Sequence, residues 1–72
     1  MFVEINGANY NMYSISSFKS KDELVENSNN TQTIKYLILY ESVSGLVLRE
    51  EFNSSEDRDA KYQTLLNDFL AK

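Results

Sequence analysis

The segment 34–52 constrains the fold more than any other part of this chain, because it predicts two β-strands joined by a turn at residues 42–45. In the first strand, residues 34–41, one parity is apolar and would line a core: Ile34, Tyr36, Ile38 and Tyr40. The opposite parity carries Leu37 and Leu39, so the middle of this strand is apolar on both faces. We therefore expect a second layer or a second chain to cover the other face.

The second strand, residues 46–52, is apolar on one side only. Leu46, Leu48 and Phe52 share one parity, while Arg49 and Glu51 occupy the other. The two-sided strand 34–41 should then lie nearer the centre of the sheet.

The dipeptide Asn6-Gly7 predicts another hairpin near the start of the chain, since it supplies the two positive φ values of a tight turn. A short apolar run at residues 2–5 precedes it, and a half-buried pattern over residues 8–15 follows.

Residues 16–33 change to a polar composition, and we expect them to form a mobile connection rather than a core element. Ser20 and Glu23 have the spacing of a capping box, which would allow one or two helical turns through Glu26. The asparagine-rich residues 27–30 would end such a helix.

An amphipathic helix is predicted from Ser54 to about Ala71. Its apolar stripe recurs at three-four spacing and consists of Tyr62, Leu65, Leu66 and Phe69. The sequence thus predicts one α+β domain, with an antiparallel sheet of about four strands in two hairpins and one C-terminal helix.

A chain of 72 residues without cysteine has few ways to gain stability other than association. We therefore expect a homo-oligomer, and the candidate interface residues are Leu37, Leu39 and Tyr13.

The residue types argue against catalysis. The chain has no histidine and no cysteine, and its two glycines form no phosphate-binding loop. We therefore expect no enzyme activity and no cofactor. The acidic residues at 56–59 match no calcium-loop pattern and are explained by the helix dipole, so we expect no metal site either.

The net charge of -4 argues against binding to a nucleic-acid backbone. Glu50, Glu51 and Asp57 belong to an acidic cluster that could meet a basic surface on a partner protein or could simply be solvated. Neither a signal peptide nor a membrane span is recognisable, so a cytoplasmic location is expected.

Both ends of the chain carry a skeleton of turn and cap residues, Phe2-Val3-Glu4-Ile5-Asn6-Gly7 and Phe52-Asn53-Ser54-Ser55-Glu56-Asp57. This skeleton resembles small uncharacterised proteins of bacteria and their phages. The resemblance implies a ββ-ββ-α layout and no particular activity.

The leading hypothesis is a non-enzymatic, homo-oligomeric module that binds another protein, of the small regulatory or phage-inhibitor kind. One alternative is a small-molecule or nucleotide binder with pockets between subunits, for which the candidate residues are Tyr36, Tyr40 and Lys35. A second alternative is a single-stranded nucleic-acid binder that stacks bases on its tyrosines.

Overall fold

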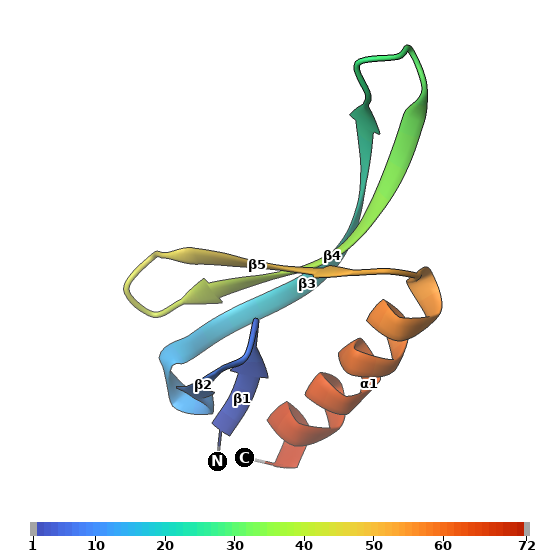
Figure 1. Ribbon diagram of the computed structural model, residues 1–72. Helices are drawn as coiled ribbons and strands as arrows, with labels where there is room; N and C mark the ends of the chain where they lie inside the picture. Colours follow the sequence, from blue (N-terminus) through green and yellow to red (C-terminus); the bar gives the residue numbers. More distant parts are fainter. Residues whose placement is uncertain (1, 72) are drawn as a thin grey trace.

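The computed structural model describes residues 2–71, and Figure 1 shows its elements. They are β1 (Phe2–Ile5), β2 (Ala8–Asn11), the 3₁₀ turn η1 (Met12–Ser14), β3 (Ile15–Glu26), β4 (Gln32–Ser42), β5 (Val47–Phe52) and α1 (Ser55–Ala71). The α+β class, the antiparallel pairing and the C-terminal helix are confirmed. The single sheet of four strands is wrong, because β1 and β2 form one sheet while β3, β4 and β5 form another.

The turn between β1 and β2 follows directly from its two residues. Asn6 has a φ of 53° and Gly7 a φ of 83°, which matches the twist that a two-residue hairpin requires. The return strand is shorter than expected. It ends at Asn11, whose side-chain oxygen accepts a hydrogen bond from the Tyr13 N–H (2.9 Å) and so begins η1.

We expected residues 16–33 to form a mobile connection with one or two helical turns. This is wrong, because most of this polar segment belongs to β3. β3 pairs with β4 from Ile15–Ser42 out to Glu26–Gln32, with an irregularity between Ile15 and Ser17. Buried backbone N–H and C=O groups need hydrogen-bond partners, and β3 supplies these partners along one edge of β4. Only residues 27–31 form the turn, in which Asn30 adopts a φ of 64°.

β4 lies in the centre of the three-stranded sheet, as its two apolar faces predict. β5 pairs with residues 36–41 of β4 through the turn at Gly45, which has a φ of 90°. The hairpin expected over residues 34–52 is therefore confirmed.

One face of this sheet is covered by α1 and by the β1–β2 hairpin (Figure 1). The buried residues of this core are Val3, Ile5, Met12, Ile15, Ile38, Tyr40 and Leu65. The helix starts where Ser54 predicts, because the Ser54 Oγ accepts a hydrogen bond from the Asp57 N–H (3.1 Å). Phe18 of β3 packs against the rings of Tyr62 and Phe69 on the helix.

Beyond the end of β5, the β3–β4 hairpin continues alone as a two-stranded ribbon that points away from the helix and the other strands (Figure 1). We call residues 23–35 the arm. Leu24 and Ile34 face each other across it and are 61% and 49% exposed. No helix within residues 2–71 is long and apolar enough to cross a membrane.

Candidate functional site

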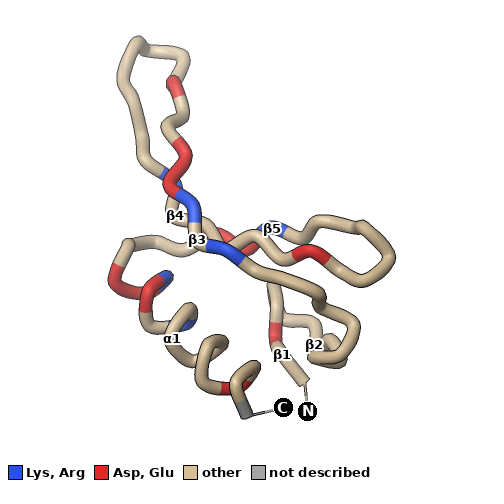
Figure 2. The backbone as a smooth tube through the Cα atoms, turned by 180° about the vertical axis from the view of Figure 1, so that it is seen from behind, with Lys and Arg blue, Asp and Glu red and all other residues tan. Residues whose placement is uncertain are grey.

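Two uncharged segments of the sequence meet at one end of the molecule. No charged residue lies between Glu4 and Lys19, and none lies between Glu41 and Arg49. The Val43 N–H of the β4–β5 turn donates a hydrogen bond to the Ser14 carbonyl (2.9 Å), which joins this turn to η1. In Figure 2 the backbone of the β4–β5 turn and of the segment between β2 and β3 is accordingly tan, without red or blue. We call the exposed part of this region the neutral end, and its apolar residues are Tyr13, Val43, Leu46 and Val47.

The neutral end exposes large apolar side chains. Tyr13, Val43 and Leu46 are 65%, 69% and 68% exposed, and Val47 is also exposed. The 3₁₀ turn explains the position of Tyr13, because it buries the neighbouring Met12 completely and directs the next side chain outward. Ser14 fixes this turn by donating from its Oγ to the Asn11 carbonyl (2.6 Å).

The β4–β5 turn is held in one shape by its serines. The Ser42 Oγ accepts a hydrogen bond from the Leu46 N–H (3.0 Å), and the Gly45 N–H donates to the Ser42 carbonyl (3.0 Å). Because these bonds satisfy the backbone, Val43 and Leu46 are presented on a preformed turn and need little further ordering on binding.

An open hollow of about 430 Å³ adjoins the neutral end on the sheet face away from the helix. Its lining comes from β3, β4 and β5 and includes Ser17, Lys19, Leu39, Glu41 and Val47. Two of the three residues that we expected at an oligomer interface, Leu39 and Tyr13, thus lie in or near this region.

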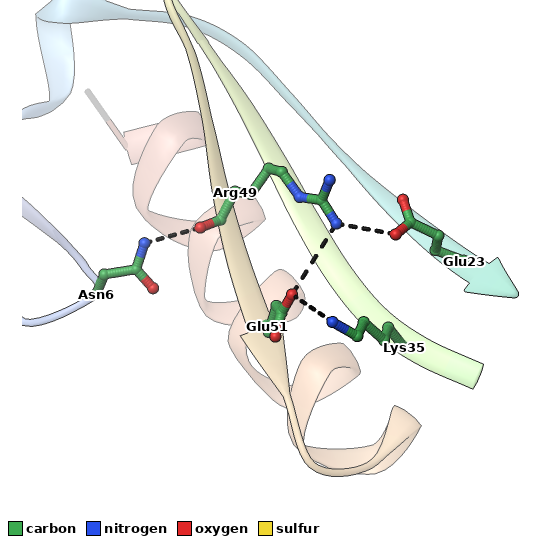
Figure 3. A network of polar contacts seen from close by, with 5 residues as sticks. All are labelled: Asn6, Glu23, Lys35, Arg49 and Glu51. Atoms are coloured by element: carbon green, nitrogen blue, oxygen red, sulfur yellow. Dashed lines mark hydrogen bonds and ion pairs between the residues drawn. The ribbon is translucent and has the colours of Figure 1, made fainter. Parts of the chain in front are cut away.

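The third expected interface residue, Leu37, is fully buried within the chain and cannot contact another molecule. Its neighbours in the register are Lys21 on β3 and Glu51 on β5. The Arg49 side chain of β5 extends across β4 and reaches Glu23 on β3, with 3.0 Å between Nη2 and Oε1 (Figure 3). Arg49 lies opposite Leu39 and Glu23 opposite Lys35, so this ion pair passes over Leu37.

A second ion pair completes this cover. The Lys35 Nζ lies 3.4 Å from the Glu51 Oε1, and Arg49 lies 4.0 Å from the same oxygen (Figure 3). Long charged side chains can cover apolar surface with their aliphatic stems while their charges stay in water. The apolar second face of β4 is therefore covered in its middle by side chains of the same sheet.

The residues expected for a small-molecule site do not come together. Lys35 lies on the ion-paired face, whereas Tyr36 and Tyr40 have the opposite parity and face the helix side. The Arg58 guanidinium lies 5.6 Å from the centre of the Tyr36 ring, and it also bonds Asp22. Tyr40 is fully buried.

Tyr40 belongs to a polar cluster inside the core face. Its hydroxyl donates to the Glu50 Oε1 (2.6 Å), and the Lys61 Nζ donates to the same carboxylate (3.1 Å) and to the Glu4 carbonyl (2.7 Å). Burial is the main cause that raises the pKa of Tyr40, and the hydrogen bond to the Glu50 carboxylate adds to it. Tyr40 therefore stays protonated and donates to Glu50.

The predicted acidic cluster is also divided. Glu50 is paired with Lys61 on the helix side, and Glu51 is paired with Lys35 on the opposite face. Asp57 is exposed in the first turn of the helix, away from both of these pairs. These three carboxylates therefore do not form one surface that could attract a basic partner. No group of His, Cys, Asp or Glu side chains within residues 2–71 has an arrangement that could hold a metal ion.

The fold and this surface define an antiparallel α+β protein with an uncharged, partly apolar end and a protruding two-stranded arm. The scan of family models, the search of curated proteins and the search of solved structures found no match to this chain. The resemblance noted from the turn and cap residues stays a prediction.

The neutral end was not predicted, although its two uncharged segments are visible in the sequence. Neither segment indicates a binding site by itself, since each resembles an ordinary turn or strand. They meet only in the folded structure, where the Val43 N–H bonds the Ser14 carbonyl and Ile15 pairs with Ser42.

Proposed function

We propose that the protein binds another protein through the neutral end. The observation that carries this proposal is the group of exposed apolar side chains on a surface without charge, in a chain with seven basic and eleven acidic residues. The centres of protein interfaces are depleted of charged residues and enriched in tyrosine. Exposed apolar side chains that form a contiguous patch on a small protein often mark a binding site.

The partner that fits this surface has an uncharged, apolar patch of its own. Tyr13 supplies a large ring with few rotatable bonds, and Val43 and Leu46 flank it on the fixed turn. A basic partner is not favoured by this surface, because the hollow beside it is lined by one acidic and one basic residue, Glu41 and Lys19.

The test is affinity capture with the purified protein as bait, in a lysate of the cells that produce it. We expect Val43→Glu and Leu46→Glu to reduce the captured partner by at least about tenfold, since each puts an unpaired charge in the interface. Leu70→Glu is the matched control, because Leu70 is also an exposed apolar residue, at 84%, but lies near the end of α1.

The proposal is wrong if the same partner is captured in equal amounts by all three variants. It is also wrong if the wild-type protein captures nothing that an unrelated acidic protein of similar size does not capture. Melting curves should show that each glutamate variant is folded, since the substituted side chains are exposed.

The hollow beside the neutral end supports a second candidate function, the binding of a small amphipathic molecule. Its volume of about 430 Å³ is in the range of small-molecule sites, and it offers an apolar floor at Leu39 between Lys19 and Glu41. A panel of nucleotides and small metabolites should then raise the melting temperature of the wild-type protein but not of Leu39→Arg. If no compound raises it, this candidate is dismissed.

A further inference from the structure

β3 leaves one long edge of the three-stranded sheet without a neighbouring strand among residues 2–71. We propose that a second copy of this chain pairs antiparallel with this edge, so that Lys21 of both copies lies on the two-fold axis and a six-stranded sheet results. This surface is distinct from the neutral end, and the inference does not depend on the proposed function.

The backbone of β3 is arranged for such pairing. At the end of the hairpin the Asn27 N–H donates to the Thr31 carbonyl (2.8 Å), which makes these two residues a hydrogen-bonded pair. Bonded and non-bonded pairs alternate along an antiparallel ladder, so the odd-numbered residues of β3 bond to β4. The N–H and C=O groups of the even-numbered residues 18–24 consequently point outward from the sheet.

The charges of β3 are self-complementary in this register. Antiparallel pairing about Lys21 places Lys19 opposite Glu23 of the second copy, and Glu23 opposite Lys19, in two identical ion pairs. Both belong to the odd-numbered positions, where opposing side chains are closest because the backbones do not bond across the new interface there. Glu23 is already oriented on this sheet face by Arg49.

The same register pairs apolar residues. Phe18 lies opposite Leu24 of the second copy, on the face that carries α1. Leu24 is mostly exposed in the single chain, because the arm extends beyond the helix and β5. An isolated two-stranded ribbon is only marginally stable, so pairing along the arm would stabilise the part of the fold that has the least support.

Neighbouring registers are less favourable. A shift by one step in one direction places Lys19 opposite Lys21 in two like-charged pairs. A shift in the other direction forms ion pairs between Lys21 and Glu23 but places Asp22 opposite Asp22. That second shift also loses the apolar pair, because it places Phe18 opposite Glu26 and Leu24 opposite Ser20. In the proposed register the only like-charged pair joins Lys21 of one copy to Lys21 of the other. The Glu23 side chains of both copies flank this pair. Lysines on an edge strand usually prevent pairing with foreign strands, and here Lys19 would select a strand that carries the matching acid.

The absence of cysteine from the chain allows a direct test by disulfide formation. Cα atoms of a non-bonded pair lie about 4.5 Å apart, which is within the range that a disulfide requires. Oxidised Lys21→Cys should therefore form a covalent dimer at least about tenfold faster than Ser17→Cys, which is exposed on the same face of β3 but away from the axis. The proposed register places Ser17 opposite Val25 of the second copy. In an equimolar mixture of Ser17→Cys and Val25→Cys, mixed dimers should therefore make up more than half of all covalent dimers, the fraction that random pairing would give.

Native mass spectrometry gives the second measurement. The wild-type protein should show twice the chain mass of 8.3 kDa, and Lys19→Glu should raise the dissociation constant of the dimer by at least about tenfold, because it places two carboxylates opposite each other. Circular dichroism should show that Lys19→Glu is folded, since Lys19 is exposed. A wild-type monomer at about 0.1 mM overturns the proposal, and so does equal oxidation of Lys21→Cys and Ser17→Cys.

Discussion

Arg49 on β5 forms an ion pair with Glu23 on β3 across the whole width of β4, with 3.0 Å between the Nη2 and Oε1 atoms (Figure 3). The two outer strands of the sheet are thus connected by side chains as well as through β4. Beneath this pair lies Leu37, which the sequence marked as a candidate for contact with another chain and which the structure buries completely.

The cover over Leu37 can be tested by separating the charge of Arg49 from its aliphatic stem. Arg49→Met should lower the free energy of unfolding by less than about 1 kcal/mol, since exposed ion pairs contribute little. Arg49→Ala should lower it by about 1–2 kcal/mol, because the stem is lost as well. Urea denaturation measures both values, and equal values would show that the stem does not cover Leu37.

The Glu50–Lys61 pair should matter more for stability, because both side chains are largely removed from water. Lys61→Met leaves the Glu50 carboxylate without its cation, and we expect a loss of about 1–3 kcal/mol, below the value for a fully buried pair. The double variant Lys61→Met/Glu50→Gln should recover part of this loss. If the double variant is as unstable as the sum of the single variants, the two side chains do not interact.

The raised pKa of Tyr40 leads us to expect that the folded protein loses stability at alkaline pH. Its pKa is raised in the folded protein above the ordinary value of 10.0, so below pH 10 the hydroxyl is protonated in both the folded and the unfolded state. Above this pH the unfolded chain releases the proton while the folded protein retains it. The stability advantage of the wild type over Tyr40→Phe should then fall by up to about 1.4 kcal/mol per pH unit. Denaturation of both proteins between about pH 8 and 11 checks this, and a constant difference would contradict it.

Asn6 has two roles that substitutions can separate. It adopts a positive φ in the turn, and its Nδ2 donates to the Arg49 carbonyl on the outer edge of β5 (2.7 Å). Asn6→Gly keeps the turn and loses only the hydrogen bond, with an expected cost of about 0.5–1.5 kcal/mol. Asn6→Ala should cost about 1 kcal/mol more, because alanine is strained at this φ. Thermal unfolding of the two variants should preserve this order.

Two leucines of α1 give a matched pair of substitutions. Leu65 is 1% exposed and Leu70 is 84% exposed, although both are leucines of the same helix. We expect Leu65→Ala to lower the free energy of unfolding by about 2–5 kcal/mol and Leu70→Ala to change it by less than about 0.5 kcal/mol. A large effect of Leu70→Ala on the free protein would indicate that this residue packs against something, such as a second copy.

Local signals in the sequence were sufficient for several elements. Asn6-Gly7 specified the first turn, Gly45 the last one, and Ser54 the start of the helix, because each of these residues satisfies a backbone requirement through its own conformation or side chain. The central position of β4 also agrees with its composition, because the middle of this strand is apolar on both faces.

β3 shows why other elements could not be predicted in this way. Its residues are mostly polar, and nothing in their pattern favours a strand over a loop or a short helix. The strand forms because β4 offers a row of backbone groups that need partners. The short turn at residues 27–31 brings β4 back alongside β3, so that the two strands can pair. This stabilisation depends on a partner and is therefore absent from the local sequence.

The sequence by itself thus determined the turns, the helix and the strand at the centre of the sheet, because their physical causes lie within a few residues of each other. The tertiary structure alone decided what covers Leu37 and where the neutral end lies. Both depend on residues far apart in the chain, such as Arg49 with Glu23 and Val43 with Ser14, which meet only when the strands are in register.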